Sequence, residues 1–136
     1  MREELARRPT VLLADDDRAF LDQVCLLLKS EFEVVGAVGD GQALLAVASD
    51  LHPDLVVVDI SMPRLNGFQA AQQLKKAQPN ARILFLSVHE EAVAVSEALA
   101  IGASGYVVKR SAATDLIPAL VQVFQGNRFV SEAIRQ

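Results

Sequence analysis

Residues 53–63 read PDLVVVDISMP, in which four apolar residues follow one another and end at the carboxylate of Asp59. An apolar run that does not alternate with polar residues is typical of a strand buried on both faces, as in a parallel sheet. Pro63 and the following Asn66-Gly67 indicate a loop rather than continued regular structure. The stretch therefore predicts a buried parallel strand that carries a carboxylate at its carboxyl end.

Two other runs have the same form. Residues 11–14 read VLLA and lead into three aspartates at 15–17, and residues 106–108 read YVV and end at Lys109. If these runs lie beside residues 55–58 as parallel strands, their carboxyl ends meet at one edge of the sheet. At least three carboxylates and one ammonium then gather in one cleft.

Short apolar runs alternate with amphipathic segments of about 10–15 residues, which predicts βαβ units, a parallel sheet and right-handed crossovers. A helical bundle fits badly, because the apolar runs are too short and too β-branched for core helices. Asp17 and Asp40 are expected helix caps, Gly102 an expected helix stop, and Pro118 is expected to kink the last helix or to lie in its first turn. The expected strands are 10–14, 33–38, 55–58, 83–86 and 106–108; the expected helices follow Asp17 and Asp40 and span 68–77, 90–101 and 112–124.

Composition sets further bounds. The chain has 136 residues, is 51% hydrophobic and carries a net charge of -4. This length predicts one domain with a core of its own, and the negative charge disfavours direct binding of nucleic acid, which needs clustered Lys and Arg. The single cysteine, Cys25, excludes an internal disulfide and is expected to be a buried helical thiol. Without a membrane-length apolar run or a visible signal peptide, we expect a cytoplasmic protein without membrane contact.

The residues that follow the predicted strands suggest a chemistry. Ligands of open α/β sheets bind beyond the carboxyl ends of the strands, which is where Asp15, Asp16, Asp59, Ser87 and Lys109 fall. Closely packed carboxylates disfavour ionisation unless a cation lies between them, and clustered oxygen ligands suit Mg²⁺. A carboxylate in such a cleft can attack phosphorus, and nearby cations offset the charge on the transferring oxygens. The pattern favours phosphoryl transfer in this cleft, with Mg²⁺ held by Asp15, Asp16 and Asp59, and with Lys109 and Ser87 beside the phosphoryl oxygens.

Over about residues 10–125 the chain resembles the receiver domain of two-component response regulators. Any one motif is weak, but five in the right order and at the right spacing are specific. The matching segments are VLLADD (11–16), PDLVVVDISMP (53–63), Asn66-Gly67, LFLS (84–87) and GASGYVVK (102–109). The resemblance implies an α/β fold, a single doubly wound (βα)5 domain with a five-stranded parallel sheet in the flavodoxin-like order 2-1-3-4-5.

The resemblance also implies roles for individual residues. Asp59 would be the phosphoacceptor for a sensor histidine kinase, and Lys109 the cation that contacts the phosphoryl group. Mg²⁺ would be held by Asp15, Asp16, Asp59 and the backbone carbonyl of Ser61. The domain would be a signalling switch rather than an enzyme, although it would assist its own phosphorylation and dephosphorylation.

Ser87 and Tyr106 would be the switch pair of such a domain. Phosphorylation would draw Ser87 inward, and Tyr106 would follow into the space vacated. Tyr106 could instead be a plain aromatic residue of an edge strand. His89 would border the phosphoryl group together with Ser61 and tune its hydrolysis, and the alternative is an exposed histidine without a role.

One position departs from the pattern of the family. Many receivers have proline with a cis peptide after the lysine that corresponds to Lys109, and this chain has Arg110. A cis bond without proline costs about 3–4 kcal/mol. Either the bond is trans or the site holds that strain, and both alternatives stay open at the level of the sequence.

The C-terminal part resembles the NarL/FixJ (LuxR-type) transcription factors, through residues 98–106 and the linker-like QGNRFVSEAI at 125–134. Those proteins continue into a helix-turn-helix domain. We expect an N-terminal arm at 1–9, a receiver at 10–125 and a linker at 126–136, without an output domain. DNA would be contacted only through that missing domain.

The expected function is a phosphorylation-activated switch that controls dimerisation, as a possible homodimer, or the output of a transcriptional regulator. The alternative is a stand-alone or a phosphate-independent receiver that acts as a protein–protein interaction module on the same fold. A phosphatase with an aspartyl intermediate is disfavoured, because such relatives carry a further Asp two residues after the nucleophile, where this chain has Ser61.

Overall fold

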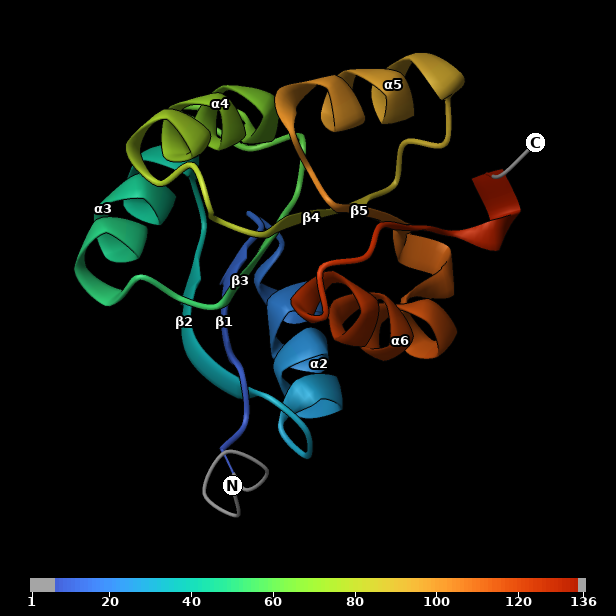
Figure 1. Cartoon of the computed structure of the whole chain (residues 1–136), viewed down its shortest axis with the longest axis horizontal. Coiled ribbons are helices and arrows are strands. Elements are labelled where there is room, and N and C mark those ends of the chain that lie inside the picture. The colour runs from blue at the N-terminus through green and yellow to red at the C-terminus, as the bar shows by residue number, and fades with distance from the viewer. Residues whose placement is uncertain (1–6, 135–136) are drawn as a thin grey trace.

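The computed structural model describes residues 7–134 and has a parallel six-stranded sheet at its centre (Figure 1). The strand order is β2-β1-β3-β4-β5-β6, which confirms the predicted order of five strands and adds a short strand at the β5 edge. The strands are β1 (Thr10–Ala14), β2 (Glu33–Val38), β3 (Leu55–Val58), β4 (Ile83–Ser87), β5 (Gly105–Val108) and β6 (Phe129–Val130).

Helices cover both faces of the sheet, so the fold is doubly wound as predicted (Figure 1). They are α2 (Arg18–Leu28), α3 (Gly41–Leu51), α4 (Gly67–Ala77), α5 (Ala92–Ile101) and α6 (Ala112–Phe124). Successive side chains of β1 go to opposite faces: Leu12 joins the core under α3, α4 and α5, and Leu13 joins the core under α2 and α6. Cys25 packs at the margin of the second core and is only partly buried. Within residues 7–134, no helix is long and apolar enough to cross a membrane.

The helix ends follow local sequence signals. As predicted, the side chains of Asp17 and Asp40 cap α2 and α3, accepting hydrogen bonds from the amides of Phe20 (3.1 Å) and Ala43 (2.8 Å). Gly102 ends α5 in the left-handed conformation, with φ of 112°. Each cap fixes the point at which the chain leaves the carboxyl or amino edge of the sheet.

Three helix details differ from expectation. α5 begins at Ala92 rather than at Glu90, because the residues before it form a loop tied to neighbouring strands. α4 already begins at Gly67, which the sequence assigns to a loop. Pro118 lies in the second turn of α6 rather than in the first. It is exposed, so water can hydrogen-bond the carbonyl that its missing N–H leaves unpaired.

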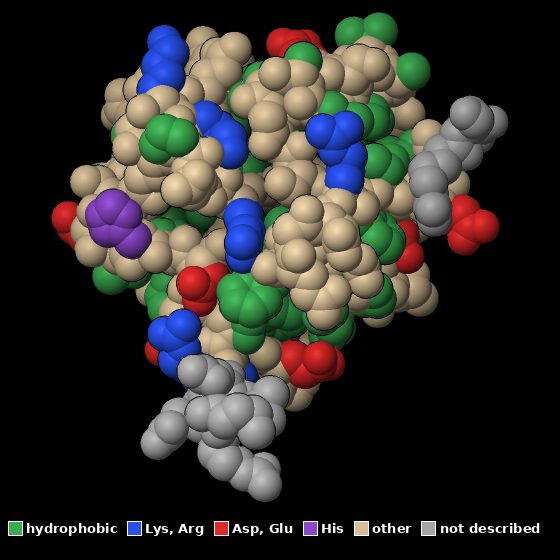
Figure 2. Space-filling view, in the orientation of Figure 1, with side chains coloured by type: hydrophobic (Ala, Val, Ile, Leu, Met, Phe, Trp, Pro, Cys, Tyr) green, Lys and Arg blue, Asp and Glu red, His purple; other side chains and the backbone are tan. Residues whose placement is uncertain are grey.

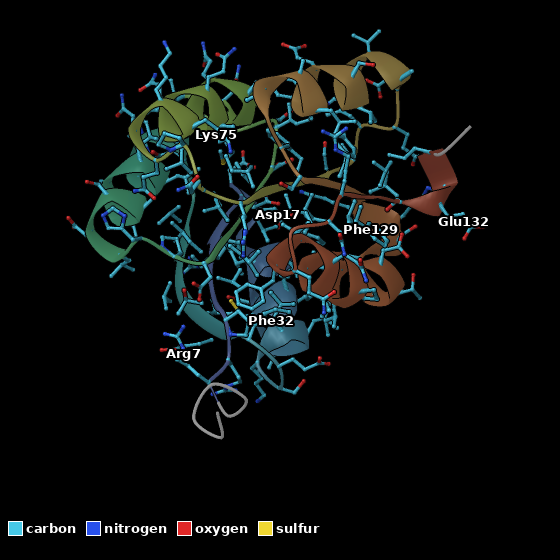
Figure 3. The ribbon with its side chains drawn as sticks, in the orientation of Figure 1. Arg7, Asp17, Phe32, Lys75, Phe129 and Glu132 are labelled. Atoms are coloured by element: carbon cyan, nitrogen blue, oxygen red, sulfur yellow. The ribbon has the colours of Figure 1, made fainter. Side chains whose placement is uncertain are left out.

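The predicted linker at 126–136 contains ordered structure. β6 pairs in parallel with β5, Phe129 opposite Gly105 and Val130 opposite Tyr106. Phe129, labelled in Figure 3, packs on the core beside α6, and Ile134 packs on the opposite core. Residues 135–136 and residues 1–6 of the predicted arm lie outside the described residues.

Ser131 attaches this segment to the rest of the domain. Its side chain is fully buried and its amide donates to the carbonyl of Tyr106 at 2.9 Å. Its hydroxyl donates to Asp115 at 2.8 Å and accepts from the amide of Val108 at 3.2 Å. The buried serine therefore joins β6, β5 and α6 through one oxygen.

Replacing Ser131 with alanine is expected to destabilise the domain by about 1–3 kcal/mol, because the buried amide of Val108 loses its partner and the Asp115 carboxylate loses a donor. Urea unfolding measures the loss. Ser49→Ala removes an exposed hydroxyl of α3 and is expected to change stability by less than about 0.5 kcal/mol. Equal stability of the two variants would show that the C-terminal segment is not docked in solution.

Candidate functional site

Three predicted residues meet at the carboxyl edge of the sheet. Asp15 and Asp16 follow β1, Asp59 follows β3, and one carboxylate oxygen from each lies within 4.8 Å of the others. Asp15 and Asp59 are only 4% and 6% exposed, whereas Asp16 is exposed. Asp17, labelled in Figure 3, stays at the start of α2, and its amide donates to Asp15 at 2.8 Å. The cluster arises because neighbouring parallel strands end together.

Lys109, in the short 3-10 helix directly after β5, lies against this cluster. Its Nζ is 2.7 Å from Asp15 and 3.5 Å from Asp59, and its side chain is 15% exposed. Nζ also lies 4.6 Å from the centre of the Phe20 ring on α2, an arrangement that attracts a cation to an aromatic face. Nothing in the local sequence around Phe20 indicates this contact.

The charges perturb one another because water is largely excluded. Burial raises the pKa of Asp59, the nearby Asp15 raises it further, and Lys109 only partly offsets both effects. Burial alone lowers the pKa of Lys109, but its hydrogen bond to Asp15 and the charges of Asp15 and Asp59 outweigh burial and raise it. The ammonium group of Lys109 therefore stays protonated between two carboxylates. The ionised form of Asp59 is disfavoured by its burial and by the charge of Asp15.

Replacing Asp59 with asparagine is expected to stabilise the domain at neutral pH. Because the pKa of Asp59 is raised by folding, the folded state binds more protons between the unfolded and folded pKa values, and stability falls as pH rises through that interval. Asparagine does not titrate. The stability gained by Asp59→Asn over wild type is therefore absent below the ordinary aspartate pKa of ~3.9. It grows as the pH rises from there to the raised pKa of folded Asp59, and it stays constant above that pKa.

The expected gain at pH 7 is on the order of 1 kcal/mol, measured by urea unfolding at several pH values. Asp16→Asn is the matched control, because Asp16 is exposed and its charge is better screened by water. A smaller gain is expected for this control. If Asp59→Asn were less stable than wild type at pH 7, ionised Asp59 would not be destabilising the folded protein.

The predicted switch residues lie beside the cluster. Ser87 and Tyr106 are both fully buried. The amide of His89 donates to Ser87 Oγ at 3.1 Å, and the hydroxyl of Tyr106 donates to the His89 carbonyl at 2.8 Å. His89 Nε2 is 3.4 Å from Ser61 Oγ. Tyr106 is therefore neither at a sheet edge nor exposed, and His89 lies beside Ser61.

The ring of Tyr106 already lies in the buried interior in this structure, where the switch hypothesis would have it move after phosphorylation. Burial raises the pKa of its hydroxyl, and the negative charges of Glu91, Asp59 and Glu90 raise it further, against a lowering by Ser87. The hydroxyl therefore stays protonated and acts as a hydrogen-bond donor to the loop before α5.

The loop after Asp59 is packed against the start of α4. The amide of Gly67 donates to the Ile60 carbonyl at 2.7 Å. A Cβ at Gly67 would collide with the main-chain carbonyl of Asp59. Asn66 and Gln69 form a reciprocal capping box there. The Asn-x-x-Gln spacing was a readable signal for this helix start, but the close backbone approach has no sequence signal beyond glycine itself.

Arg110 is the departure noted in the sequence. Its preceding peptide bond is trans, because residues 7–134 contain no cis bond. Its guanidinium makes a forked contact with Glu90, at 2.7 and 2.8 Å. This pair joins the loop before α5 to the turn after β5, and the sequence did not predict it.

The donor set fits Mg²⁺. All candidate ligands are oxygens, which Mg²⁺ prefers, and Asp16 keeps one side of the cluster open to water. Two buried carboxylates face one ammonium group, so the site has an excess of negative charge that a cation can neutralise. On the face shown in Figure 2, Lys and Arg side chains are separated rather than gathered in one basic patch.

Comparison with known proteins agrees with this geometry. Residues 11–121 match the family described as the response regulator receiver domain. The chain is 34% identical over 122 residues to the transcriptional regulatory protein DegU of Brevibacillus brevis, across 88% of this chain and 52% of that protein. It is also 34% identical over 127 residues to the nitrate/nitrite response regulator protein NarL of Escherichia coli K12, across 92% of this chain and 59% of that protein.

A solved structure extends the likeness to three dimensions. A two-component response regulator of the LuxR family from Aurantimonas sp. SI85-9A1 superposes with a TM-score of 0.90 at 27% identity, over 93% of this chain and 92% of that chain. The chain spans little more than half the length of the two curated relatives. It belongs to the response regulator receiver domain family and is a receiver of the NarL/FixJ (LuxR-type) kind.

Proposed function

We propose that Asp59 receives a phosphoryl group from a sensor histidine kinase and that the resulting acyl phosphate shifts the domain between two states. The observation that carries this proposal is the buried carboxylate of Asp59, 3.5 Å from Lys109 Nζ and clustered with Asp15 and Asp16. A structural ion pair needs one carboxylate for one ammonium. Two carboxylates facing Lys109, with a third in the same cluster, suit a site that receives a cation and a phosphoryl group.

In the transfer, a carboxylate oxygen of Asp59 attacks phosphorus and forms the new bond. The bond from phosphorus to the imidazole nitrogen of the kinase breaks, and its electron pair stays on that nitrogen. A small acyl phosphate donates in the same way, with a carboxylate as the leaving group. Lys109, held by Asp15, is placed to offset charge on the phosphoryl oxygens.

Mg²⁺ is the cofactor of the proposed reaction. The carboxylates of Asp15, Asp16 and Asp59 and the backbone carbonyl of Ser61 would hold it. When bound, it supplies positive charge beside the transferring phosphoryl oxygens. The chain itself supplies the nucleophile at Asp59, the second cation at Lys109 and the exclusion of water from both.

The response to the phosphoryl group is proposed to pass through Ser87. Its hydroxyl can turn toward a phosphoryl oxygen on Asp59, and that movement alters its hydrogen bond with the amide of His89. The carbonyl of His89 accepts from Tyr106, so residues 88–91 and β5 respond together. The phosphoryl group thus favours one arrangement of the loop by binding it better.

The partners of the whole protein are proposed from the relatives of this domain. The two curated relatives are named as a transcriptional regulatory protein and a response regulator. We propose that this receiver controls dimerisation or an attached output domain, and that DNA contact belongs to that output domain. A phosphate-independent interaction module is the alternative.

The test is incubation with Mg²⁺ and a small acyl phosphate, read as a mass increase of one phosphoryl group. Wild type is expected to gain the group, and Asp59→Asn is expected to gain none. Asp16→Asn, which keeps the acceptor, separates loss of the cation site from loss of the nucleophile, because added Mg²⁺ is expected to restore part of its rate. No gain by the wild type from the small donor or from a histidine kinase would favour the interaction module.

A further inference from the structure

The loop before α5, residues 88–91, is held from three directions. The Tyr106 hydroxyl donates to the His89 carbonyl at 2.8 Å, and Ser61 Oγ lies 3.4 Å from Nε2 of the His89 ring. Nε and Nη2 of Arg110 donate to the two carboxylate oxygens of Glu90, at 2.7 and 2.8 Å. The first contact belongs to the switch described above. The third comes from the turn that also carries Lys109.

Together with the ion pair between Lys109 and Asp59, the second and third of these contacts close a ring that runs through Asp59. Its three non-covalent links are Lys109 with Asp59, Ser61 with His89, and Glu90 with Arg110. Short stretches of main chain connect them, since Lys109 precedes Arg110, His89 precedes Glu90, and Asp59 is two residues before Ser61. Opening the Glu90–Arg110 link frees one side of the ring without touching any residue that would contact phosphorus or a metal.

We propose that Arg110 and Glu90 form a latch that holds the loop at residues 88–91 beside Ser61, two residues after Asp59, and sets the lifetime of the phosphoryl group on Asp59. This inference rests on the proposed function and names its regulation. Arg110 acts as a positioning residue, because it acts through Glu90 and the loop. Hydrolysis consumes one water: its oxygen bonds to phosphorus, the bond from phosphorus to the Asp59 oxygen breaks, and inorganic phosphate leaves. An open loop gives that water more room.

The chemistry of the pair suits a latch rather than a structural brace. Both side chains are well exposed, 61% for Arg110 and 39% for Glu90, and exposed pairs contribute little to global stability. A forked guanidinium–carboxylate contact nevertheless fixes orientation through two parallel hydrogen bonds. Since the charges face solvent, dissolved salt screens their attraction. The latch is therefore weak enough to open and is sensitive to ionic strength.

The experiment measures the half-life of phosphorylated protein by mass after removal of the donor, at low and high salt. Arg110→Ala and Glu90→Ala are each expected to shorten the half-life about two- to fivefold at low salt, the range that a good exposed pair allows. Wild type is expected to approach the variants at high salt, whereas the variants change little. The reciprocal swap of Glu90→Arg with Arg110→Glu is expected to recover most of the half-life and its salt dependence.

A second readout needs neither phosphate nor metal. The amide of His89, bonded to Ser87, is expected to exchange its hydrogen faster in Arg110→Ala than in wild type, while the thermal midpoint stays unchanged. Arg64→Ala is the matched control, because it removes another exposed guanidinium contact, with Asp40, and is expected to leave the half-life unaltered.

The outcomes separate the two proposals. A wild type that takes up no phosphoryl group overturns the proposed function. A wild type that is phosphorylated, but whose half-life matches that of Arg110→Ala at every salt concentration, overturns the latch alone. Failure of the reciprocal swap to recover the half-life, with both proteins folded, also overturns it.

Discussion

Gly67→Ala is expected to cost about 3 kcal/mol or more of stability and to reduce phosphoryl uptake by Asp59 as well. The new methyl group would collide with the main-chain carbonyl of Asp59 and crowd the backbone of Ile60. Main-chain atoms cannot rotate away as a side chain can, so either α4 moves or the loop after β3 moves. Urea unfolding measures the first effect, and the mass assay with a small acyl phosphate measures the second.

Gly39→Ala is the control for this substitution. Its added methyl group would meet only the Asp15 carbonyl, at the ordinary contact distance of 3.9 Å, and a change below about 1 kcal/mol is expected. If Gly67→Ala were as stable and as readily phosphorylated as Gly39→Ala, then α4 would not be packed on the Asp59 main chain in solution. The site would in that case tolerate more movement than its geometry suggests.

The close approach at Gly67 also explains how the site is positioned. The Gly67 amide donates to the carbonyl of Ile60, and Asn66 caps the helix. The first turn of α4 is therefore fixed to the residues that immediately follow the phosphoacceptor. Packing of α4 on the core and the position of the Asp59 backbone are parts of one arrangement.

The sequence was sufficient for five of the six strands of the sheet and for the acidic cluster. Three unbroken apolar runs predicted buried parallel strands, and the residues that end them had to meet at one edge. Asp15, Asp59 and Lys109 are brought together for this reason. Helix caps such as Asp17 and Asp40 were equally readable, because each acts within three residues of its own position.

What the sequence did not predict depends on contacts between distant segments. β6 has only two residues, too few for a pattern, and it exists because Ser131 finds buried partners on β5 and α6. The Glu90–Arg110 pair joins residues 20 positions apart. The sequence around Glu90 and Arg110 does not indicate that these two side chains form an ion pair. The full burial of Tyr106 likewise depends on the neighbouring strands rather than on its own segment.

Lys109→Met is expected to slow phosphorylation of Asp59 by about a hundredfold or more, because the preorganised cation that faces the transferring oxygens is lost. Methionine keeps most of the apolar stem that packs near Phe20, so the loss is mainly electrostatic. Uptake from a small acyl phosphate at fixed Mg²⁺, followed by mass, gives the rate. Lys76→Met, which removes an exposed lysine of α4, is expected to react at the wild-type rate.

The same substitution has a second consequence that helps to interpret the first. Without Lys109, the buried carboxylates of Asp15 and Asp59 lose the ammonium that lies 2.7 and 3.5 Å from them. Their repulsion then raises the pKa of Asp59 further and destabilises the protein at neutral pH. Mg²⁺ should offset that loss, since a cation in the cluster replaces the missing charge. Stability rescued by Mg²⁺ together with a rate that stays low would assign Lys109 to the transferring phosphoryl group. Full recovery of the rate at high Mg²⁺ would instead limit Lys109 to holding the carboxylates together.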